Sequence, residues 1–199
     1  IRFPGPYTEK LLDILDRYNV KATFFVTNGK PDYQNLIAQE AQRGHTVAIH
    51  SASHDYAKIY QSVDAYFADF DEMNSIITAQ TGKAADLVRF PGGSSNTISK
   101  KYCYGIMSQL VCAVEERGFR YCDWNVSSGD AGGTTSTSQV VANVIEGIKS
   151  NNVSVVLQHD IKNFSVDAVE QIIQWGLSEG YTFLPMTSTT PMSHHGVNN

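Results

Sequence analysis

The chain has 199 residues, a net charge of −5, 42% apolar residues and 18% charged residues. This length is enough for one domain with a sizeable core, and the composition excludes disordered, collagen-like and coiled-coil chains. The acidic balance, with no cluster of Lys or Arg, argues against nucleic acid or an anionic membrane surface as a partner.

The sequence contains no visible targeting or membrane segment. No apolar run is long enough to cross a bilayer, and residues 1–7 lack the charged start and apolar stretch of a signal peptide. The chain is therefore expected to be cytosolic, or to be a mature or excised domain. Its cysteines fit neither a zinc ribbon nor a C-x-x-C pair, so free thiols are expected, with one disulfide and a spare thiol as the alternative. They are Cys103, Cys112 and Cys122.

Strand and helix patterns alternate along nearly the whole chain. Strand patterns span residues 1–3, 22–27, 46–50, 87–90, 121–124, 153–158 and 181–184. Helical patterns span residues 8–18, 31–41, 62–81, 100–117, 138–150 and 166–180. Thr8 is expected to cap the first helix, and Gly44 and Gly82 to close the second and third. This order predicts an α/β fold with about seven mostly parallel strands, either open or closed into a barrel.

The last thirteen residues differ in character from the rest. Residues 187–199 are polar and aperiodic, and they are expected to form a linker or a frayed end. The domain is therefore predicted to span residues 1–186, followed by a polar C-terminal tail.

Polar side chains follow several of the predicted strands, where parallel α/β folds gather their functional groups. His50 and His54 follow the strand at 46–50, in the stretch H-S-A-S-H. If the chain turned helically there, both imidazoles would reach one face and share a metal ion. Taken alone, the pair is explained at least as well by surface or hydrogen-bonded core histidines.

Three further strand ends carry candidate groups. Arg89 precedes a Pro-Gly-Gly turn that lets backbone N–H groups approach a ligand. Trp124 supplies an aromatic wall beside Asp123 and Asp130, and His159 ends the strand pattern at 153–158. Each segment alone has a structural explanation as an ordinary loop. Four such segments at one edge of the sheet favour a functional site.

These four segments resemble the motifs of polysaccharide deacetylases with a NodB-type homology domain, carbohydrate esterase family 4. The resemblance covers about residues 7–186, and it implies a distorted (β/α) barrel with fewer than eight strands. It also implies removal of acetyl groups from N-acetylglucosamine units of peptidoglycan or a chitin-like polymer. The matching motifs are H-S-x-x-H at His50 and His54, R-F-P-G-G at Arg89 to Gly93, W-N-V-S-S-G-D at Trp124 to Asp130, and L-x-H at Leu157 to His159.

The resemblance implies a role for each matching residue. His50 and His54 would hold a divalent ion together with a carboxylate; Zn²⁺ suits that donor set best, with Co²⁺ or Ni²⁺ as alternatives. His159 resembles the general acid that protonates the departing amine, and Arg89 resembles the arginine that orients a base aspartate.

This sequence departs from the family pattern at the acid partner of His159. Ser127 occupies the position that often carries this acid, so Asp130 is predicted to take its place. Backbone N–H groups near the Pro-Gly-Gly turn are expected to receive the developing oxyanion, and Trp124 to form an apolar wall. The predicted substrate-binding residues are Pro91, Gly92, Gly93, Trp124 and Leu157.

The first motif of the family is incomplete in this sequence. The family pattern T-F-D-D-G-P supplies a base aspartate and a third metal ligand, whereas residues 1–8 read I-R-F-P-G-P-Y-T. The flanks match, so the simplest alignment omits a D-D-G stretch between Phe3 and Pro4. Either the acids belong to the molecule and are missing from the sequence as read, or the chain is an inactive carbohydrate-binding relative. The other intact motifs favour the first, which the separation of the Phe3 and Pro4 Cα atoms would test, since bonded residues lie about 3.8 Å apart.

The resemblance also implies a cellular location, and a third function remains as an alternative. A polysaccharide substrate lies outside the cytoplasm, so the parent protein is expected to be secreted or anchored at the cell surface. A barrel glycosidase is the more distant alternative. It needs two carboxylates that flank the scissile bond, and Asp123, Asp130 and Asp160 form no recognisable pair in the sequence.

Overall fold

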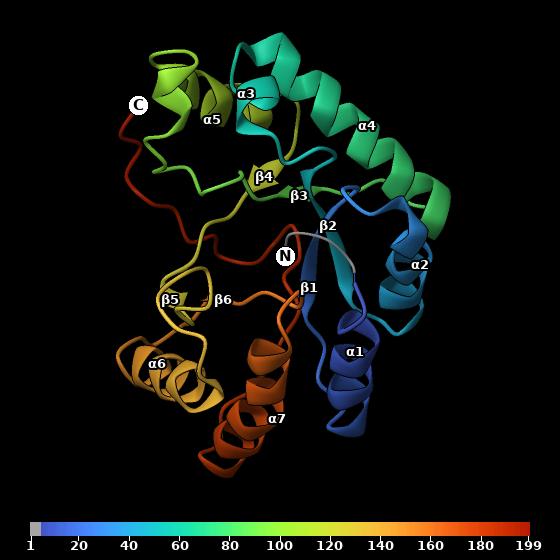
Figure 1. Ribbon diagram of the computed structural model, residues 1–199, viewed down its shortest axis with the longest axis vertical. Helices are drawn as coiled ribbons and strands as arrows, with labels where there is room; N and C mark the ends of the chain where they lie inside the picture. The colour runs from blue at the N-terminus through green and yellow to red at the C-terminus, as the bar shows by residue number, and fades with distance from the viewer. Residues whose placement is uncertain (1–4) are drawn as a thin grey trace.

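The computed structural model describes residues 5–199 (Figure 1). The strand expected at residues 1–3 and the spacing of Phe3 and Pro4 lie outside this part. The helices are α1 (Thr8–Arg17), α2 (Asn35–Gln42), α3 (Tyr56–Ile59), α4 (Val63–Thr81), α5 (Ile106–Glu116), α6 (Thr137–Lys149) and α7 (Asn163–Ser178). The strands are β1 (Thr23–Thr27), β2 (Thr46–Ser51), β3 (Leu87–Val88), β4 (Arg120–Tyr121), β5 (Val126–Ser127) and β6 (Val156–Leu157).

All pairs of neighbouring strands are parallel, as the alternation of elements predicts. Strands β1 to β4 form one sheet in the order β1-β2-β3-β4, and β5 pairs with β6 in a second sheet. The predicted barrel of about seven strands is not what residues 5–199 form, since their six strands do not close. A largely apolar cavity of about 860 Å³ is lined by residues of both β1 and β6, and these two strands are not paired across it.

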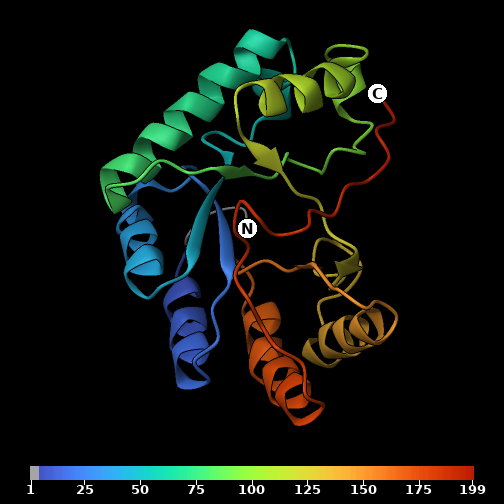
Figure 2. The same ribbon diagram turned by 180° about the vertical axis from the view of Figure 1, so that it is seen from behind.

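Helices cover the two sheets on separate sides (Figures 1 and 2). Helices α2 and α4 pack against β2, and α6 packs against α7 and β5. The main core cluster joins α1, β1, β2, α4 and α5, whereas a smaller cluster fills the space between α6 and α7. Helix α7 contributes buried residues to both clusters and so connects them.

Local signals in the sequence located most helix ends. The Ser62 hydroxyl accepts a hydrogen bond from the Ala65 N–H at the start of α4, and Gly82 ends that helix with a left-handed backbone. At α1 the expected cap is wrong by one position, because Thr8 is already helical and Tyr7 is the N-cap. The helix predicted from residue 100 begins only at Ile106, after a separate 3₁₀ turn over Ser99–Lys101.

Two strand predictions are wrong. Residues 181–184 form no strand, and the side chains of Tyr181 and Leu184 are exposed rather than buried against a sheet. Conversely, the two-residue strand β5 forms where the sequence indicated a loop. Two residues are too few to produce a period-2 pattern, so the alternation rule could not detect β5.

The C-terminal segment is packed against the domain and is not a frayed end. The Met186 carbonyl accepts a hydrogen bond from the Thr46 hydroxyl at 2.7 Å, where the segment begins. At its end, the buried Asn199 accepts hydrogen bonds from the N–H groups of Gly105 and Ser108. Polar residues therefore bond to backbone groups of the domain here, which composition alone does not reveal. The predicted boundary at residue 186 stays a prediction.

Two other expectations concern the cysteines and the membrane. All three cysteines are free thiols, as predicted, with Cys122 buried and Cys112 exposed. Within residues 5–199, no helix combines the length and the apolar character needed to cross a membrane.

Glu40 is buried in α2, and neither of its carboxylate oxygens has a hydrogen-bond partner among the described residues. Burial, reinforced by the charge of Asp160, raises the pKa of Glu40 well above its ordinary 4.5. The unfolded chain therefore ionises first as the pH rises, and stability falls above about pH 4.5. We expect Glu40→Gln to raise the free energy of unfolding at pH 7 by roughly 1–3 kcal/mol, with a smaller gain at pH 4. Denaturant unfolding at both pH values measures this, and equal effects would contradict it.

Candidate metal and catalytic site

Most of the predicted site residues meet at one pocket of about 380 Å³, beside the carboxyl ends of β2, β3 and β6. Those that line it are His50, His54, Arg89, Gly92, Trp124, Leu157 and His159. Three other predicted residues, Pro91, Gly93 and Asp130, do not line the pocket but contact residues that do or lie next to them in the chain. The sequence motifs are therefore brought together in space, while the roles assigned to them stay predictions.

The imidazole rings of His50 and His54 lie close together across a short turn, with ring centroids 5.1 Å apart and ring planes tilted by 55°. The turn is not helical, contrary to the sequence expectation: β2 ends at Ser51, and His54 adopts φ of +54°. A positive φ is uncommon for a residue with a side chain and marks a position that its surroundings enforce. The two rings therefore converge through a bend in the chain rather than through a helical repeat.

The carboxylate of Asp69, in α4, stabilises this bend through hydrogen bonds. It accepts them from the Ser51 hydroxyl at 2.5 Å and from the N–H groups of Ala52 and Ser53 at 2.8 Å each. The Ser51 hydroxyl oxygen in turn accepts from the N–H of His54 at 2.8 Å. Sequence reasoning missed Asp69, although a signal existed: Asp69 interrupts the apolar stripe of α4.

His50 is held in a tautomer and a protonation state that suit a metal ligand. Its Nδ1–H donates to the Arg89 carbonyl at 2.6 Å, because a carbonyl can only accept, and this fixes the tautomer with the lone pair on Nε2. Burial lowers the pKa of His50 well below 6.5, so the ring is neutral at physiological pH, the form that binds metals.

The donor set fits a zinc-type ion only in part. Two imidazoles within reach of each other suit Zn²⁺, Co²⁺ or Ni²⁺. Within residues 5–199, however, no three His, Cys, Asp or Glu side chains are grouped so that they could hold a metal ion. The described part of the chain thus supplies half of a tetrahedral site, and a carboxylate ligand would have to come from outside it.

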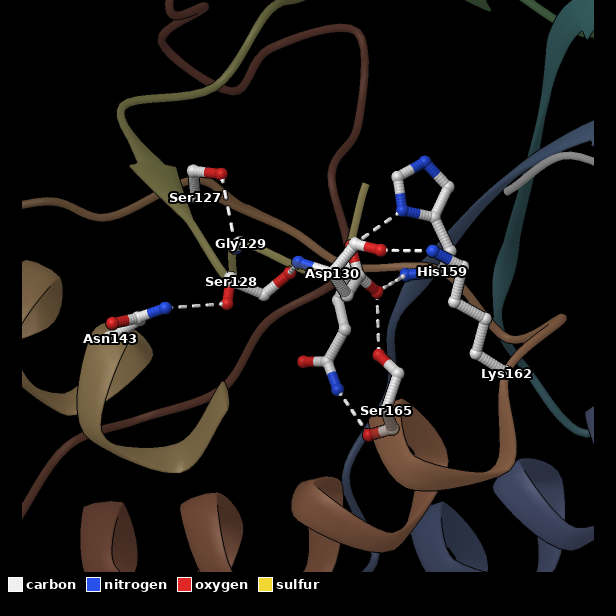
Figure 3. Close-up of polar contacts among 9 residues, drawn as sticks. Ser127, Ser128, Gly129, Asp130, Asn143, His159, Lys162 and Ser165 are labelled. Atoms are coloured by element: carbon white, nitrogen blue, oxygen red, sulfur yellow. Dashed lines mark hydrogen bonds and ion pairs between the residues drawn. The ribbon is translucent and has the colours of Figure 1, made fainter. Parts of the chain in front are cut away.

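The half-buried His159 pairs with the buried Asp130 beside the pocket (Figure 3). Asp130 Oδ1 lies 2.7 Å from His159 Nδ1, and Asp130 Oδ2 accepts from the His159 N–H at 2.7 Å and from the Ser165 hydroxyl at 2.6 Å. Although burial opposes ionisation, these hydrogen bonds and the imidazole lower the pKa of Asp130 to about 2. The Nε2 atom of His159 points away from Asp130 and is left for chemistry in the pocket.

The structure distinguishes the two sequence positions, Ser127 and Asp130, that were considered for the acid partner of His159. Ser127 is exposed, and its hydroxyl accepts only from the Gly129 N–H at 3.3 Å. Asp130 reaches His159 because the chain folds back over residues 127–130 after β5 (Figure 3). The same carboxylate is held by Ser165 of α7, so the pair joins the loops that follow β5 and β6.

Arg89 is buried and rigid, and both of its observed side-chain bonds go to the backbone. Its Nε and Nη2 donate to the carbonyls of Cys122 and Asp123, each at 2.9 Å, and its guanidinium lies 4.1 Å from the centre of the Phe25 ring. No carboxylate of residues 5–199 forms an ion pair with it. Burial lowers the pKa of Arg89, because it disfavours the charged form and outweighs the opposing attraction of Asp123.

The Pro-Gly-Gly turn offers one donor for an oxyanion. Proline has no N–H, and the Gly93 N–H is already bonded to the Phe90 carbonyl at 2.8 Å. The exposed Gly92, which lines the pocket, is therefore the one residue of this turn whose N–H can meet a developing negative charge. The expectation of several N–H donors from Pro91 to Gly93 is wrong in that respect.

Gly92 also permits a close approach that a side chain would block. Its φ is +81°, and a Cβ atom would lie 2.7 Å from the Tyr56 hydroxyl. Gly82 has a similar φ of +76° but nothing within 4 Å of that position. We expect Gly82→Ala to cost about 1–2 kcal/mol through backbone strain, and Gly92→Ala about 1 kcal/mol more, with a displaced Tyr56 and impaired substrate binding. Denaturant unfolding and KM measure this, and equal costs would contradict the steric argument.

Four residues of the pocket were not singled out in the sequence. They are Tyr56 of α3, Ala131, Ile161 and Lys162, and the Lys162 ammonium donates to the Asp130 carbonyl. Tyr56 belongs to a single-turn helix, and Lys162 precedes α7 as its N-cap. No local pattern distinguishes these positions from ordinary loop residues, because only the tertiary fold turns them toward the site.

Comparison with known proteins defines the class to which this fold and pocket belong. A family model described as polysaccharide deacetylase matches residues 3–104, which include the histidine pair and the Pro-Gly-Gly turn. The chain belongs to this family, as the sequence motifs predict.

Particular relatives agree with this assignment. The crystal structure of the catalytic domain of a peptidoglycan N-acetylglucosamine deacetylase from Eubacterium rectale is 70% identical to this chain, covers 98% of it and 90% of that domain, and has a TM-score of 0.97. A polysaccharide deacetylase from Bacillus cereus is 30% identical, with 96% and 91% covered and a TM-score of 0.83. A peptidoglycan-N-acetylglucosamine deacetylase of Bacillus cereus is 31% identical over 90% of this chain, which spans 64% of that protein's length.

Proposed function

We propose that this chain is a metal-dependent hydrolase that removes acetyl groups from N-acetylglucosamine units of a polysaccharide, with peptidoglycan as the first candidate and a chitin-like polymer as the second. The observation that carries the proposal is that the imidazoles of His50, His54 and His159 all line one pocket. The names of the relatives from Eubacterium rectale and Bacillus cereus support peptidoglycan as the substrate. Because that polymer lies outside the cytoplasm, we also propose a secreted or surface-anchored protein.

The metal proposed for the site is zinc, with cobalt or nickel able to replace it. His50 and His54 would bind it, and a carboxylate beyond the described residues would complete the set. When bound, such an ion lowers the pKa of a coordinated water molecule and polarises the acetamide carbonyl.

The residues of this chain would transfer protons, bind the oxyanion and contact the substrate. His159 would protonate the departing amine through Nε2, while Asp130 holds its Nδ1–H and stabilises the charged ring. The Gly92 N–H would donate to the oxyanion as the carbonyl becomes tetrahedral. Trp124 and Leu157 would form the apolar walls against the sugar and its acetyl group.

Two features of the described residues support the hypothesis that the first-motif acids belong to the protein. Between residues 5 and 199, the two imidazoles have no third ligand and Arg89 has no acidic partner. A carboxylate pair between Phe3 and Pro4, as the family pattern requires, would supply both. Arg89 would then orient a base aspartate.

The alternative is a carbohydrate-binding relative without catalysis, and the incomplete ligand set favours it if the acids are truly lost.

The positions of the three candidate carboxylates disfavour a glycosidase. Asp123 is bonded to Ser94, Asp130 to His159, and Asp160 to Thr8, and none of these three acids lines the pocket. No pair is therefore placed to flank a glycosidic bond.

Acetate release from N-acetylglucosamine oligomers and from peptidoglycan tests the proposal. The expected result is release that a chelator abolishes and added zinc restores. Persistent inactivity with one bound zinc per chain, verified by metal analysis, would eliminate the enzyme in favour of the binding protein. Shortening of the oligomer, detected by mass spectrometry, would indicate a glycosidase instead.

A further inference from the structure

The C-terminal segment, residues 187–199, runs along the domain (Figures 1 and 2). It contacts Trp124, which lines the pocket. The Asp123 N–H donates to the Ser193 carbonyl at 2.7 Å, and Asp123 Oδ2 accepts from the His195 N–H at 2.9 Å. Beyond this point Asn199 is bonded to the start of α5. The segment is thus fixed on both sides of His195.

His195 joins the two loops that form one wall of the pocket. Its Nε2–H donates to the Trp124 carbonyl at 2.6 Å, because a carbonyl can only accept. Its Nδ1 lies 3.0 Å from the Ser95 hydroxyl, which donates to it when the ring is neutral. Trp124 follows β4 and Ser95 follows β3, so a single imidazole from a distant segment bridges both.

The same imidazole packs against the side chain of Trp124. The two rings meet edge to face with centroids 4.7 Å apart, and the far edge of the indole approaches Gly93, where a Cβ atom would lie 3.0 Å away. The half-buried indole is thereby held between His195 and the Pro-Gly-Gly turn, and it lines the pocket. His195 itself does not line the pocket.

We propose that His195 is a positioning residue, which sets the orientation of the Trp124 indole and so the shape of the sugar-binding wall. The proposal rests on the proposed function, since that function gives Trp124 its contact with the sugar. His195 acts through Trp124 and makes no contact with His159, so its loss changes substrate binding rather than proton transfer. The C-terminal segment thereby contributes to the site without touching the substrate.

The test uses Trp124 as its own reporter. Trp124 and Trp175 are the two tryptophans of the chain, so Trp175→Phe leaves one indole in the pocket. In that background, His195→Ala is expected to increase acrylamide quenching of Trp124 fluorescence. It should also raise KM for an N-acetylglucosamine pentamer about two- to tenfold, the range for one lost hydrogen bond, with kcat nearly unchanged. His195→Gln, whose amide can replace one ring nitrogen, should restore part of both effects.

His194→Ala is the matched control. His194 also donates through Nε2 to a carbonyl, that of Tyr121 at 3.0 Å, and it stacks on the Tyr121 ring, but it does not touch Trp124. It should lower stability without changing the quenching or KM. Equal effects of the two alanine variants on quenching would overturn the proposal and assign the segment a structural role only. If the chain releases no acetate at all, quenching and pentamer binding still decide the role of His195.

Discussion

Replacing His159 by alanine is expected to lower kcat for acetate release by about 10²–10⁴-fold, the contribution of general acid–base catalysis. The Nδ1 of His159 is bonded to the Asp130 carboxylate, so its Nε2 can carry a proton that Asp130 stabilises electrostatically. KM should change less than kcat, because the imidazole acts on the departing amine. Steady-state kinetics on an N-acetylglucosamine oligomer measure both constants. A His159→Ala variant with nearly native kcat would remove His159 from the mechanism.

Asp130→Asn tests the partner of that imidazole through stability as well as activity. The folded-state pKa of about 2 lies below the ordinary 3.8, so the carboxylate stabilises the fold fully above pH 3.8 and loses that contribution as the pH falls toward 2. The shift corresponds to about 2 kcal/mol, which the variant should lack at pH 7. Its kcat should fall, though less than in His159→Ala, which removes the proton donor itself.

Ser127→Ala is the control for this pair. Ser127 lies in the same loop but is exposed and makes one weak bond, to the Gly129 N–H. Its loss should leave both kcat and the acid limb of the stability profile unchanged. If Ser127→Ala and Asp130→Asn had similar effects, the loop as a whole rather than the carboxylate would support His159.

The sequence predicted the elements that carry strong local signals. Helix α4 has a serine cap, a buried stripe and a terminal glycine, so its limits follow from residues within one turn of each end. Strands β3 to β6 have only two residues each, and their pairing depends on distant segments. The packing of residues 187–199 is of the same kind, since Asn199 and His195 bond to backbone groups more than 70 residues away.

The candidate site likewise contains residues that the sequence could predict and residues that it could not. Motifs directly after strands could be predicted, because parallel strands bring their carboxyl ends to one edge. Residues that act from other elements could not. Asp69 reaches the His50–His54 turn from a helix, and His195 reaches Trp124 from the C-terminal segment. In each case a polar residue in an apparently ordinary place supports a motif residue, and only the tertiary contacts reveal it.

The largest expected effect belongs to the two imidazoles that would hold the metal. His50→Ala and His54→Ala should each reduce acetate release to background and abolish zinc binding at micromolar concentrations, since each removes one of the two described donors. The metal gives a second readout besides activity. At 100 times its dissociation constant, zinc should stabilise the native chain by about 2.7 kcal/mol, and this increment should vanish in both variants.

His50 should also contribute to the stability of the metal-free chain. His50→Ala leaves the buried Arg89 carbonyl without its donor, so it should also lower the stability of the metal-free chain by about 1–3 kcal/mol. His54→Ala should likewise lose the zinc increment, because it removes the other imidazole donor. His194→Ala, outside the pocket, should keep the whole increment. Zinc stabilisation that persisted in both the His50 and His54 variants would mean that the ion does not bind between these two imidazoles.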